Sequence, residues 1–230
     1  MEQLTEQTKR FDRSAIRAVA FDLDGTLLDT VGDLGTAANV TLRHFDLPEH
    51  PLEAYRNFVG NGLLTLYRRT APAGTDEQTI IALRDYGRAY YSEHDTVLTK
   101  EYPGAGALLR ALSRAGIRLG MVTNKTETTA QHVMQHYFPD VEFTFLWGNN
   151  GVRPLKPAPD AGRQMLALLD LQPEQIVFCG DGDTDMAFAS CVGFWAAGTA
   201  WGYRPREVLA ENGADFLLDS MAELERLLLG

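Results

Sequence analysis

Short apolar runs alternate with helical patterns along most of the chain, and this alternation limits the fold more strongly than any other feature. The runs are too short for helices and too uniformly apolar for half-exposed strands, so buried parallel strands fit them. They occupy residues 17–21, 117–123, 143–147, 176–179, 194–197 and 216–218. Helical patterns lie between them at 105–115, 128–136, 160–169 and 185–189. We therefore predict an α/β protein with a doubly wound, Rossmann-like parallel sheet, which binds ligands at the carboxyl ends of its strands.

One long segment interrupts the alternation. Between residues 32 and 102 the sequence shows amphipathic helical patterns, at 34–45, 63–70 and 79–94, and no convincing strand. A connection of about 70 residues is far longer than the usual link of roughly two to six residues between a strand and a helix. This predicts a helical cap domain, 32–102, inserted into a core domain made of 17–31 and 103–230, with a polar extension at 1–16.

The composition excludes several classes of protein. Hydrophobic residues make up 45% and charged residues 23%, which argues against wholesale disorder. No apolar run approaches the roughly 18 residues that cross a bilayer, and residues 1–13 lack the apolar core of a signal peptide. The net charge of −10 disfavours contact with nucleic acid or an anionic membrane. We expect a soluble, cytoplasmic monomer or homodimer that acts on a small molecule.

The two cysteines and one pair of histidines favour structural interpretations. Cys179 and Cys191 cannot form a disulfide framework, and their apolar surroundings predict buried free thiols. His132 and His136 have the i, i+4 spacing of a helical metal pair, but no third ligand lies near them in the sequence. A solvated helix face is the favoured interpretation for them.

Two carboxylates end the first predicted strand, in Phe21-Asp22-Leu23-Asp24-Gly25-Thr26. Residues two apart on a strand point to the same side, so Asp22 and Asp24 can divide the work of attack or metal binding and of proton transfer. Gly25 permits a tight turn after them. Taken alone, the segment is equally well explained as a solvated turn rich in Asp and Gly.

Phosphate-binding groups end the second strand and occupy a later loop. Thr123 and Asn124 can donate hydrogen bonds to a phosphate oxygen, with help from a following helix, although such a pair is more often a helix cap. Lys156 lies in Arg153-Pro154-Leu155-Lys156-Pro157-Ala158-Pro159, where the prolines stiffen the loop. An exposed loop lysine is the alternative, which the presence of only four lysines in the chain weakens.

The fourth strand also ends in acids, in Gly180-Asp181-Gly182-Asp183-Thr184-Asp185. Aspartates at alternate positions resemble a calcium loop, but Met186 and Val192 stand where that loop needs glycine and glutamate. Oxygen ligands after a strand suit Mg²⁺ instead. With the other strand ends they describe a pocket in which a metal and a lysine neutralise carboxylates and a phosphoryl group.

These residues resemble the four motifs of the haloacid dehalogenase superfamily, in its phosphatase branch with a small helical cap. The motifs align with Asp22-x-Asp24-Gly25-Thr26, Thr123-Asn124, Lys156 and Gly180-Asp181-x-x-x-Asp185, and the resemblance covers Arg17 to Leu229. Within that branch the chain most resembles phosphoglycolate phosphatases. Three segments carry this closer likeness: Leu27-Leu28-Asp29-Thr30, Phe58-Val59-Gly60-Asn61-Gly62 and Trp201-Gly202-Tyr203.

The resemblance implies a role for each motif residue. Asp22 is the nucleophile that forms an aspartyl-phosphate, and Asp24 is the acid and then the base. Mg²⁺ is held by the carboxylates of Asp22 and Asp181 and by the backbone carbonyl of Asp24. Thr123, the backbone amide of Asn124 and Lys156 hold phosphoryl oxygens, and Asp185 supports the metal waters or Lys156. These roles suit phosphoryl transfer, which needs positioning and charge neutralisation.

The fourth motif and the cap carry further expectations. The family usually has Ser or Thr after the first Asp of its fourth motif, where this chain has Gly182, so a supporting hydrogen bond is expected to be missing. Asp183 is a possible surrogate ligand, with Asp181 favoured because it is nearer the strand end. In the cap, we expect Arg56, Gly60 and Asn61 to contact the substrate, and at least one of Arg56, Arg68 and Arg69 to bind a substrate carboxylate.

The expected function is Mg²⁺-dependent hydrolysis of a small organic phosphate, first of all 2-phosphoglycolate. A sugar phosphomutase or a pyrophosphatase would use the same site. A non-enzymatic alternative is a catalytically silent, phosphate-binding regulatory protein, against which the intact pair Asp22 and Asp24 counts.

Overall fold

The computed structural model describes residues 10–230 and confirms the predicted parallel sheet. Six strands lie in the order β5-β4-β1-β6-β7-β8, and each neighbouring pair is parallel. Their bounds are β1 Ala18–Phe21, β4 Arg118–Thr126, β5 Phe145–Asn149, β6 Ile176–Gly180, β7 Trp195–Thr199 and β8 Phe216–Leu218. The sheet is the α/β fold that the alternation of runs and helices predicts.

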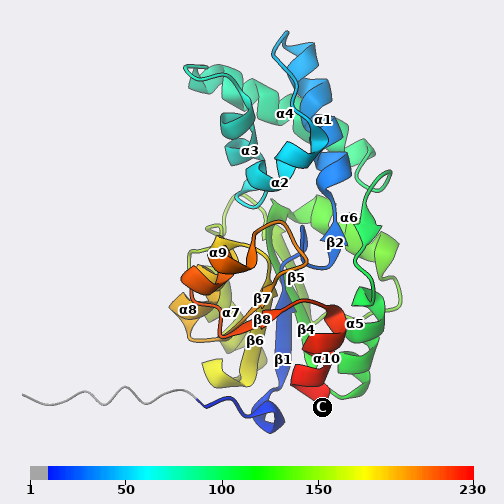
Figure 1. Cartoon of the computed structure of the whole chain (residues 1–230), viewed down its shortest axis with the longest axis vertical. Helices are drawn as coiled ribbons and strands as arrows, with labels where there is room; N and C mark the ends of the chain where they lie inside the picture. The colour runs from blue at the N-terminus through cyan, green and yellow to red at the C-terminus, as the bar shows by residue number, and fades with distance from the viewer. Residues whose placement is uncertain (1–9) are drawn as a thin grey trace, which may run out of the picture.

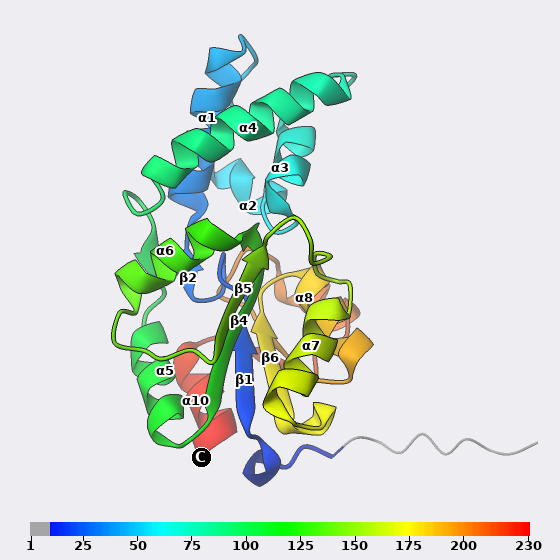
Figure 2. The same ribbon diagram turned by 180° about the vertical axis from the view of Figure 1, so that it is seen from behind.

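Helices cover both faces of the sheet, as Figures 1 and 2 show from opposite sides. One layer packs with Val19 and Phe21 of β1 and contains α5 Ala105–Arg114, α6 Glu127–Tyr137 and α10 Met221–Leu229. The other packs with Ala18 and Ala20 and contains α7 Asp160–Leu169, α8 Asp183–Val192 and α9 Arg206–Glu211. Adjacent residues of β1 thus face opposite layers and all four are buried, which explains the continuous apolar runs.

A bundle of four helices lies above the carboxyl ends of the strands (Figure 1). It comprises α1 Val31–His44, α2 Tyr55–Phe58, α3 Gly62–Thr70 and α4 Glu77–Glu93. Its own apolar core includes Leu34 and Ala38 of α1, Tyr67 of α3 and Leu83 of α4. We call residues 31–93 the helical module; the domain limits of 32–102, 17–31 and 103–230 stay a prediction.

Short elements complete the fold. The strands β2 Leu28–Asp29 and β3 Lys100–Glu101 pair antiparallel beneath the helical module, a feature that the sequence analysis missed because two-residue strands leave no periodic pattern. Single 3₁₀ turns occupy Arg13–Ala15, Leu52–Ala54 and Pro173–Gln175. In residues 10–230 no helix is long and apolar enough to cross a membrane. Residues 1–9 of the predicted extension lie outside the described part of the chain.

The predictions for cysteine and histidine have different outcomes. Cys179 is a buried free thiol as predicted, but the prediction for Cys191 is wrong, because that side chain is exposed. Cys191 lies in the last turn of α8, outside the stripe of buried residues that faces the sheet. His132 and His136 lie on the exposed face of α6, as expected.

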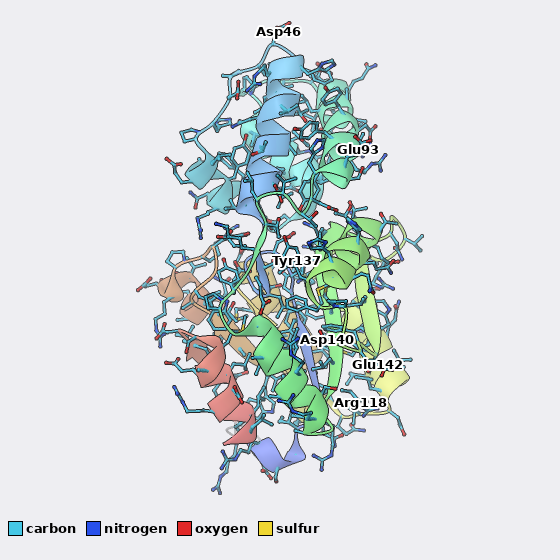
Figure 3. All side chains as sticks on the ribbon, turned by 90° about the vertical axis from the view of Figure 1, so that its right-hand side faces the viewer. Asp46, Glu93, Arg118, Tyr137, Asp140 and Glu142 are labelled. Atoms are coloured by element: carbon cyan, nitrogen blue, oxygen red, sulfur yellow. The ribbon has the colours of Figure 1, made fainter. Side chains whose placement is uncertain are left out.

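A buried carboxylate ties the first helix of the helical module to the segment that returns to the sheet. Asp33 of α1 accepts hydrogen bonds from the backbone N–H groups of Val97, Leu98 and Thr99 at 2.8–3.0 Å, and from the Thr99 hydroxyl at 2.7 Å. On the same side of the molecule, Tyr137 of α6 donates to the Thr99 carbonyl at 2.8 Å, and Figure 3 shows Tyr137 where the module meets the sheet layer. The return segment is therefore held by side chains from both parts.

Replacing Asp33 by alanine tests how much this junction contributes to stability. The substitution leaves three backbone N–H groups without their acceptor, so we expect a loss of about 3–5 kcal/mol in the free energy of unfolding. Thermal denaturation should show a fall of roughly 10 °C in Tm. The control is Asp140→Ala, which removes an exposed ion pair with Arg110 and should cost less than about 1 kcal/mol. Equal, small losses in both variants would contradict this account of the junction.

Candidate active site

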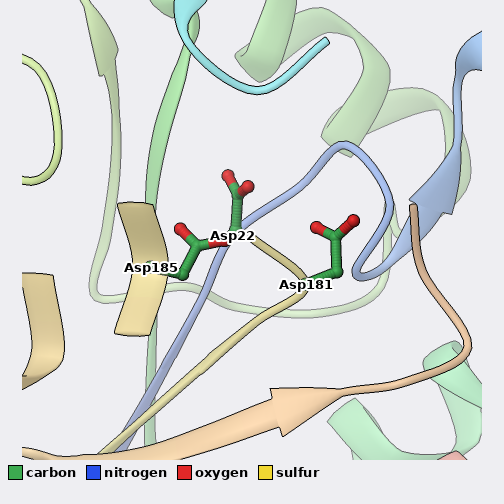
Figure 4. Close-up of side chains that lie close together, drawn as sticks. All are labelled: Asp22, Asp181 and Asp185. Carbon is green, nitrogen blue, oxygen red and sulfur yellow. The ribbon is translucent and has the colours of Figure 1, made fainter. Parts of the chain in front are cut away.

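Three aspartates converge at the carboxyl end of the sheet (Figure 4). Asp22 follows β1, Asp181 follows β6 and Asp185 lies in the first turn of α8, and one carboxylate oxygen from each lies within 4.8 Å of the others. The convergence follows from topology, because β1 and β6 are neighbours in register and their ends therefore meet. All three side chains are buried, so the cluster concentrates negative charge in a place with little water.

Lys156 supplies the positive charge that this cluster needs. Its ammonium lies 2.7 Å from Asp185 Oδ1 and 3.0 Å from Asp22 Oδ1, and the lysine side chain is only 2% exposed. Burial opposes the charged form and lowers the pKa of Lys156, but the Asp185 and Asp22 carboxylates outweigh it and raise that pKa overall. Lys156 is thus a buried cation and not an exposed loop lysine.

Burial has the opposite effect on the acids. It raises the pKa of Asp22 to about 6, against the pull of Lys156, and it raises the pKa of Asp181 well above its usual range. The charges of neighbouring aspartates add to the rise in both cases. Asp22 and Asp181 therefore hold their protons more tightly than exposed aspartates do.

Asp181 is fixed by groups from two distant loops. Thr26 Oγ1 donates to one of its oxygens at 3.1 Å and the backbone N–H of Tyr203 donates to the other at 2.7 Å. Gly25, with φ of +85°, and Gly202 lie so close that a Cβ on either would overlap the Asp181 side chain. The glycines in the first motif and in Trp201-Gly202-Tyr203 therefore make room for this carboxylate.

Gly182 and Asp183 lie beside the cluster. The backbone N–H of Gly182 donates to Asp185 Oδ2 at 2.9 Å, so the backbone orients Asp185 although Gly182 has no hydroxyl. The Asp183 carboxylate is half exposed, lies 3.9 Å from Arg204 Nε and falls outside the cluster of three. Asp181, rather than Asp183, is the acid beside Asp22.

Asp24 has partners that the sequence analysis did not identify. Thr30 Oγ1 donates to Asp24 Oδ1 at 2.7 Å, and Lys125 Nζ lies 2.8 Å from the same oxygen. Lys125 also donates to the hydroxyl of Tyr91, in α4 of the helical module, at 2.6 Å. Because the chain has only four lysines, Lys125 could have been singled out on the same ground as Lys156. No pattern in the sequence indicates that Tyr91 lies beside Lys125.

Thr123 and Asn124 lie inside β4 and not at a helix N-terminus. The strand continues to Thr126, and the expected following helix, α6, begins at Glu127. Thr123 is buried, and its hydroxyl makes a hydrogen bond that lowers the pKa of Asp22. The Asn124 side chain accepts from the backbone N–H of Lys156 at 2.8 Å and donates to the carbonyl of Gly60 at 3.1 Å. It thereby ties the Lys156 loop and the helical module to β4.

A cavity opens beside Asp22 and Asp24, between the sheet and the helical module. The module contributes a mostly apolar wall, and β4 contributes polar groups. The lining residues are Asp22, Asp24, Leu34, Val59, Gly60, Gly62, Leu63, Leu66, Tyr91, Thr123, Asn124, Lys125, Thr126 and Thr129. Gly60 is therefore placed where the sequence analysis expected a substrate contact.

The other candidate residues of the helical module do not line this cavity and have partners elsewhere. Arg56 lies 3.2 Å from Asp29 and over the ring of Tyr203. Asn61 accepts from Arg69 at 2.8 Å, and Arg68 pairs with Glu77. In this structure the positive charge at the cavity comes from Lys125.

The donor set fits a hard divalent cation. Asp22 Oδ1 is buried and makes no hydrogen bond of good geometry, although Lys156 Nζ lies 3.0 Å away. An unsatisfied carboxylate oxygen beside a second buried carboxylate, with only oxygen donors, is the environment that such a cation prefers. The site can therefore bring together a cation, the buried ammonium of Lys156 and the Thr123 hydroxyl of β4 around one anionic group.

Comparison with known proteins gives a consistent result. The family model of haloacid dehalogenase-like hydrolases matches residues 19–198. A phosphoglycolate phosphatase of Mannheimia succiniciproducens is 30% identical over 93% of this chain and 99% of its own length. One from Chromobacterium violaceum is 34% identical over 93% and 96%. A solved structure from Lactobacillus delbrueckii subsp. bulgaricus, provisionally assigned as a phosphoglycolate phosphatase, has a TM-score of 0.87 and 26% identity, covering 93% of this chain and 98% of its own.

Cation binding should depend on pH, because the cation must displace protons from the cluster. Below about pH 6 Asp22 holds a proton in the folded protein, whereas at higher pH the ionised acids repel one another until a cation binds. We expect Mg²⁺ to raise the Tm more at about pH 7.5 than at about pH 5.

Two variants show, by the same thermal-denaturation measurement, which aspartate binds the cation. Asp181→Asn should abolish the rise in Tm with Mg²⁺, and Asp183→Asn should preserve it. The reverse pattern would contradict the assignment of Asp181 to the cluster.

Proposed function

Because the chain belongs to the haloacid dehalogenase-like hydrolase family, we propose that it is a Mg²⁺-dependent phosphatase that cleaves a small phosphate monoester, 2-phosphoglycolate foremost. The observation that carries the proposal is the buried cluster of Asp22, Asp181, Asp185 and Lys156, with Asp24 two residues from the nucleophile. A binding protein would need the cation and the lysine but not a nucleophile paired with an acid.

In the first step a carboxylate oxygen of Asp22 attacks phosphorus. The new bond joins that oxygen to the phosphoryl group, and the bond between phosphorus and the ester oxygen breaks. The leaving alkoxide takes a proton from Asp24, so that the products of this step are the alcohol, an aspartyl-phosphate at residue 22 and an ionised Asp24.

In the second step water displaces the Asp22 carboxylate from phosphorus. Asp24 removes a proton from the water, whose oxygen bonds to phosphorus as the bond to Asp22 breaks. Inorganic phosphate leaves, Asp22 is again a carboxylate and Asp24 is again protonated. Thr30 Oγ1 and Lys125 Nζ both contact Oδ1 of Asp24, which holds this carboxylate in one orientation through both steps.

The remaining residues hold the phosphoryl group and its charge. Thr123 Oγ1, the backbone N–H of Asn124 and Lys156 Nζ would bind phosphoryl oxygens, while Asp185 keeps Lys156 in place at 2.7 Å. The carboxylates of Asp22 and Asp181 and the backbone carbonyl of Asp24 would hold Mg²⁺. When bound, Mg²⁺ neutralises the negative charge shared by the carboxylates and the phosphoryl group.

The names of the relatives support 2-phosphoglycolate as the substrate, and the cavity supports a small substrate. A sugar phosphomutase would return the phosphoryl group to its substrate, and a pyrophosphatase would release two phosphates. Each would give a different product from the same aspartyl-phosphate, so the products distinguish the three activities.

Phosphate release over a substrate panel tests the proposal. The panel contains 2-phosphoglycolate, p-nitrophenyl phosphate, hexose phosphates, nucleoside monophosphates and pyrophosphate, each with Mg²⁺ and with a chelator. We expect Mg²⁺-dependent release, fastest from 2-phosphoglycolate, and a fall of at least about 10³-fold in kcat for Asp22→Asn. The matched control Asp219→Asn changes an exposed aspartate that pairs with Arg206, and it should keep full activity.

Three outcomes would contradict parts of the proposal. Release that survives Asp22→Asn would exclude Asp22 as the nucleophile. Isomerised sugar phosphate without free phosphate would indicate a mutase. Tight, Mg²⁺-dependent binding of inorganic phosphate without turnover of any substrate would indicate the silent regulatory protein.

A further inference from the structure

Lys125 is a buried lysine whose ammonium has one N–H donor that the proposed catalytic steps do not use. Its side chain is 4% exposed, yet it lines the cavity beside Asp22 and Asp24. An ammonium has three N–H donors. Asp24 Oδ1 accepts one at 2.8 Å and the Tyr91 hydroxyl accepts another at 2.6 Å, which leaves a third donor for a group in the cavity.

The surroundings of Lys125 indicate what that group is. The wall provided by the helical module is apolar, with Leu34, Val59, Leu63 and Leu66 among its residues. Lys125 is the one cationic side chain among the residues that line the cavity, since Arg56, Arg68 and Arg69 have partners elsewhere. Arg204 lines an adjoining pocket that also contains Asp22 and Asp24, but its guanidinium donates to the carbonyls of Arg56 and Val59. An anion on the leaving group would therefore meet Lys125 in this cavity, in a place where burial strengthens the attraction.

The position of Lys125 also limits how far that anion lies from the ester oxygen. Asp24 is the proposed donor to the leaving oxygen, and Lys125 touches the same carboxylate at Oδ1. A group bound by Lys125 thus lies within a few bonds of the leaving oxygen, as the carboxylate of a 2-hydroxy acid does.

We propose that Lys125 is the anion-binding residue of the leaving-group subsite, and that it selects phosphate esters of short hydroxy acids over neutral esters of the same size. The proposal rests on the proposed phosphatase activity and deepens it by assigning the specificity to a residue of β4. Tyr91 is a positioning residue, because it reaches from α4 to hold the lysine on the cavity side of Asp24.

A pair of nearly isosteric substrates separates recognition from catalysis. In 2-hydroxyethyl phosphate a neutral CH₂OH group replaces the carboxylate of 2-phosphoglycolate, while the scissile bond is unchanged. Any effect of Lys125 on Asp24 falls on both substrates alike, so the ratio of their kcat/KM values reports binding of the carboxylate alone. We expect this ratio to favour 2-phosphoglycolate by at least about 100-fold in the wild type and to fall at least about 10-fold in Lys125→Met.

Further variants control for structural damage. Lys125→Gln keeps a polar side chain without the charge and should lower the ratio as Lys125→Met does, whereas Lys125→Arg should restore part of it. Tyr91→Phe should lower the ratio by a smaller factor, about 3-fold, because the lysine remains but loses the hydrogen bond that positions it. Lys100→Met removes an exposed lysine of β3 and should leave both rates unchanged. An unchanged ratio in Lys125→Met and Lys125→Gln, with both rates lowered equally, would overturn the proposal and leave Lys125 as a counter-ion to Asp24.

A binding measurement makes the result independent of turnover. In 3-phosphonopropionate a CH₂ group replaces the ester oxygen of 2-phosphoglycolate, so the compound cannot be hydrolysed. By calorimetry with Mg²⁺ present, it should bind the wild type at least about 10-fold more tightly than Lys125→Met. Such a difference without any phosphatase activity would support the subsite and refute the proposed function. Equal affinities would refute the subsite even if 2-phosphoglycolate is hydrolysed.

Discussion

Carboxylates that share a buried space repel one another, and the rest of the site depends on how this repulsion is balanced. Lys156 balances part of it through contacts of 2.7 and 3.0 Å to Asp185 and Asp22. The remainder is visible in the raised pKa values of Asp22 and Asp181, and in an Asp22 oxygen without a well-formed hydrogen bond. The same imbalance makes the cluster unfavourable in isolation and would favour the binding of a cation and a phosphoryl group.

The order of the strands brings part of this site together, and loops supply the rest. Asp22 and Asp181 meet because β1 and β6 are adjacent, and Thr123 joins them because β4 lies on the other side of β1. Loops then refine the arrangement: Gly25 and Gly202 let the backbone approach Asp181, and Asn124 ties the Lys156 loop and Gly60 to β4. The helical module closes the cavity from above, and its Tyr91 holds Lys125 beside Asp24.

Much of this could be predicted from the sequence, for identifiable reasons. Buried parallel strands leave continuous apolar runs, so the sequence predicted the six strands of the sheet. It also predicted the aspartates that follow β1 and β6. Contacts between distant segments leave no such pattern. The sequence pattern around Lys125 is that of an ordinary residue near a strand end, and only the structure shows Tyr91 and Asp24 in contact with it. The ion pair between Arg56 and Asp29 likewise has no signal in the sequence. Cys191 lies in a partly apolar helix, but on the face that points away from the sheet.

The central claim is that Asp22 becomes covalently phosphorylated, and chemical trapping tests it most directly. The protein is mixed with 2-phosphoglycolate and Mg²⁺, quenched within milliseconds and reduced with borohydride, which converts an acyl phosphate to the corresponding alcohol. Peptide mass spectrometry should then find homoserine at position 22, and none in a sample without substrate. Rapid phosphate release with no modified residue, or with the modification at Asp24 or Asp181, would contradict the account.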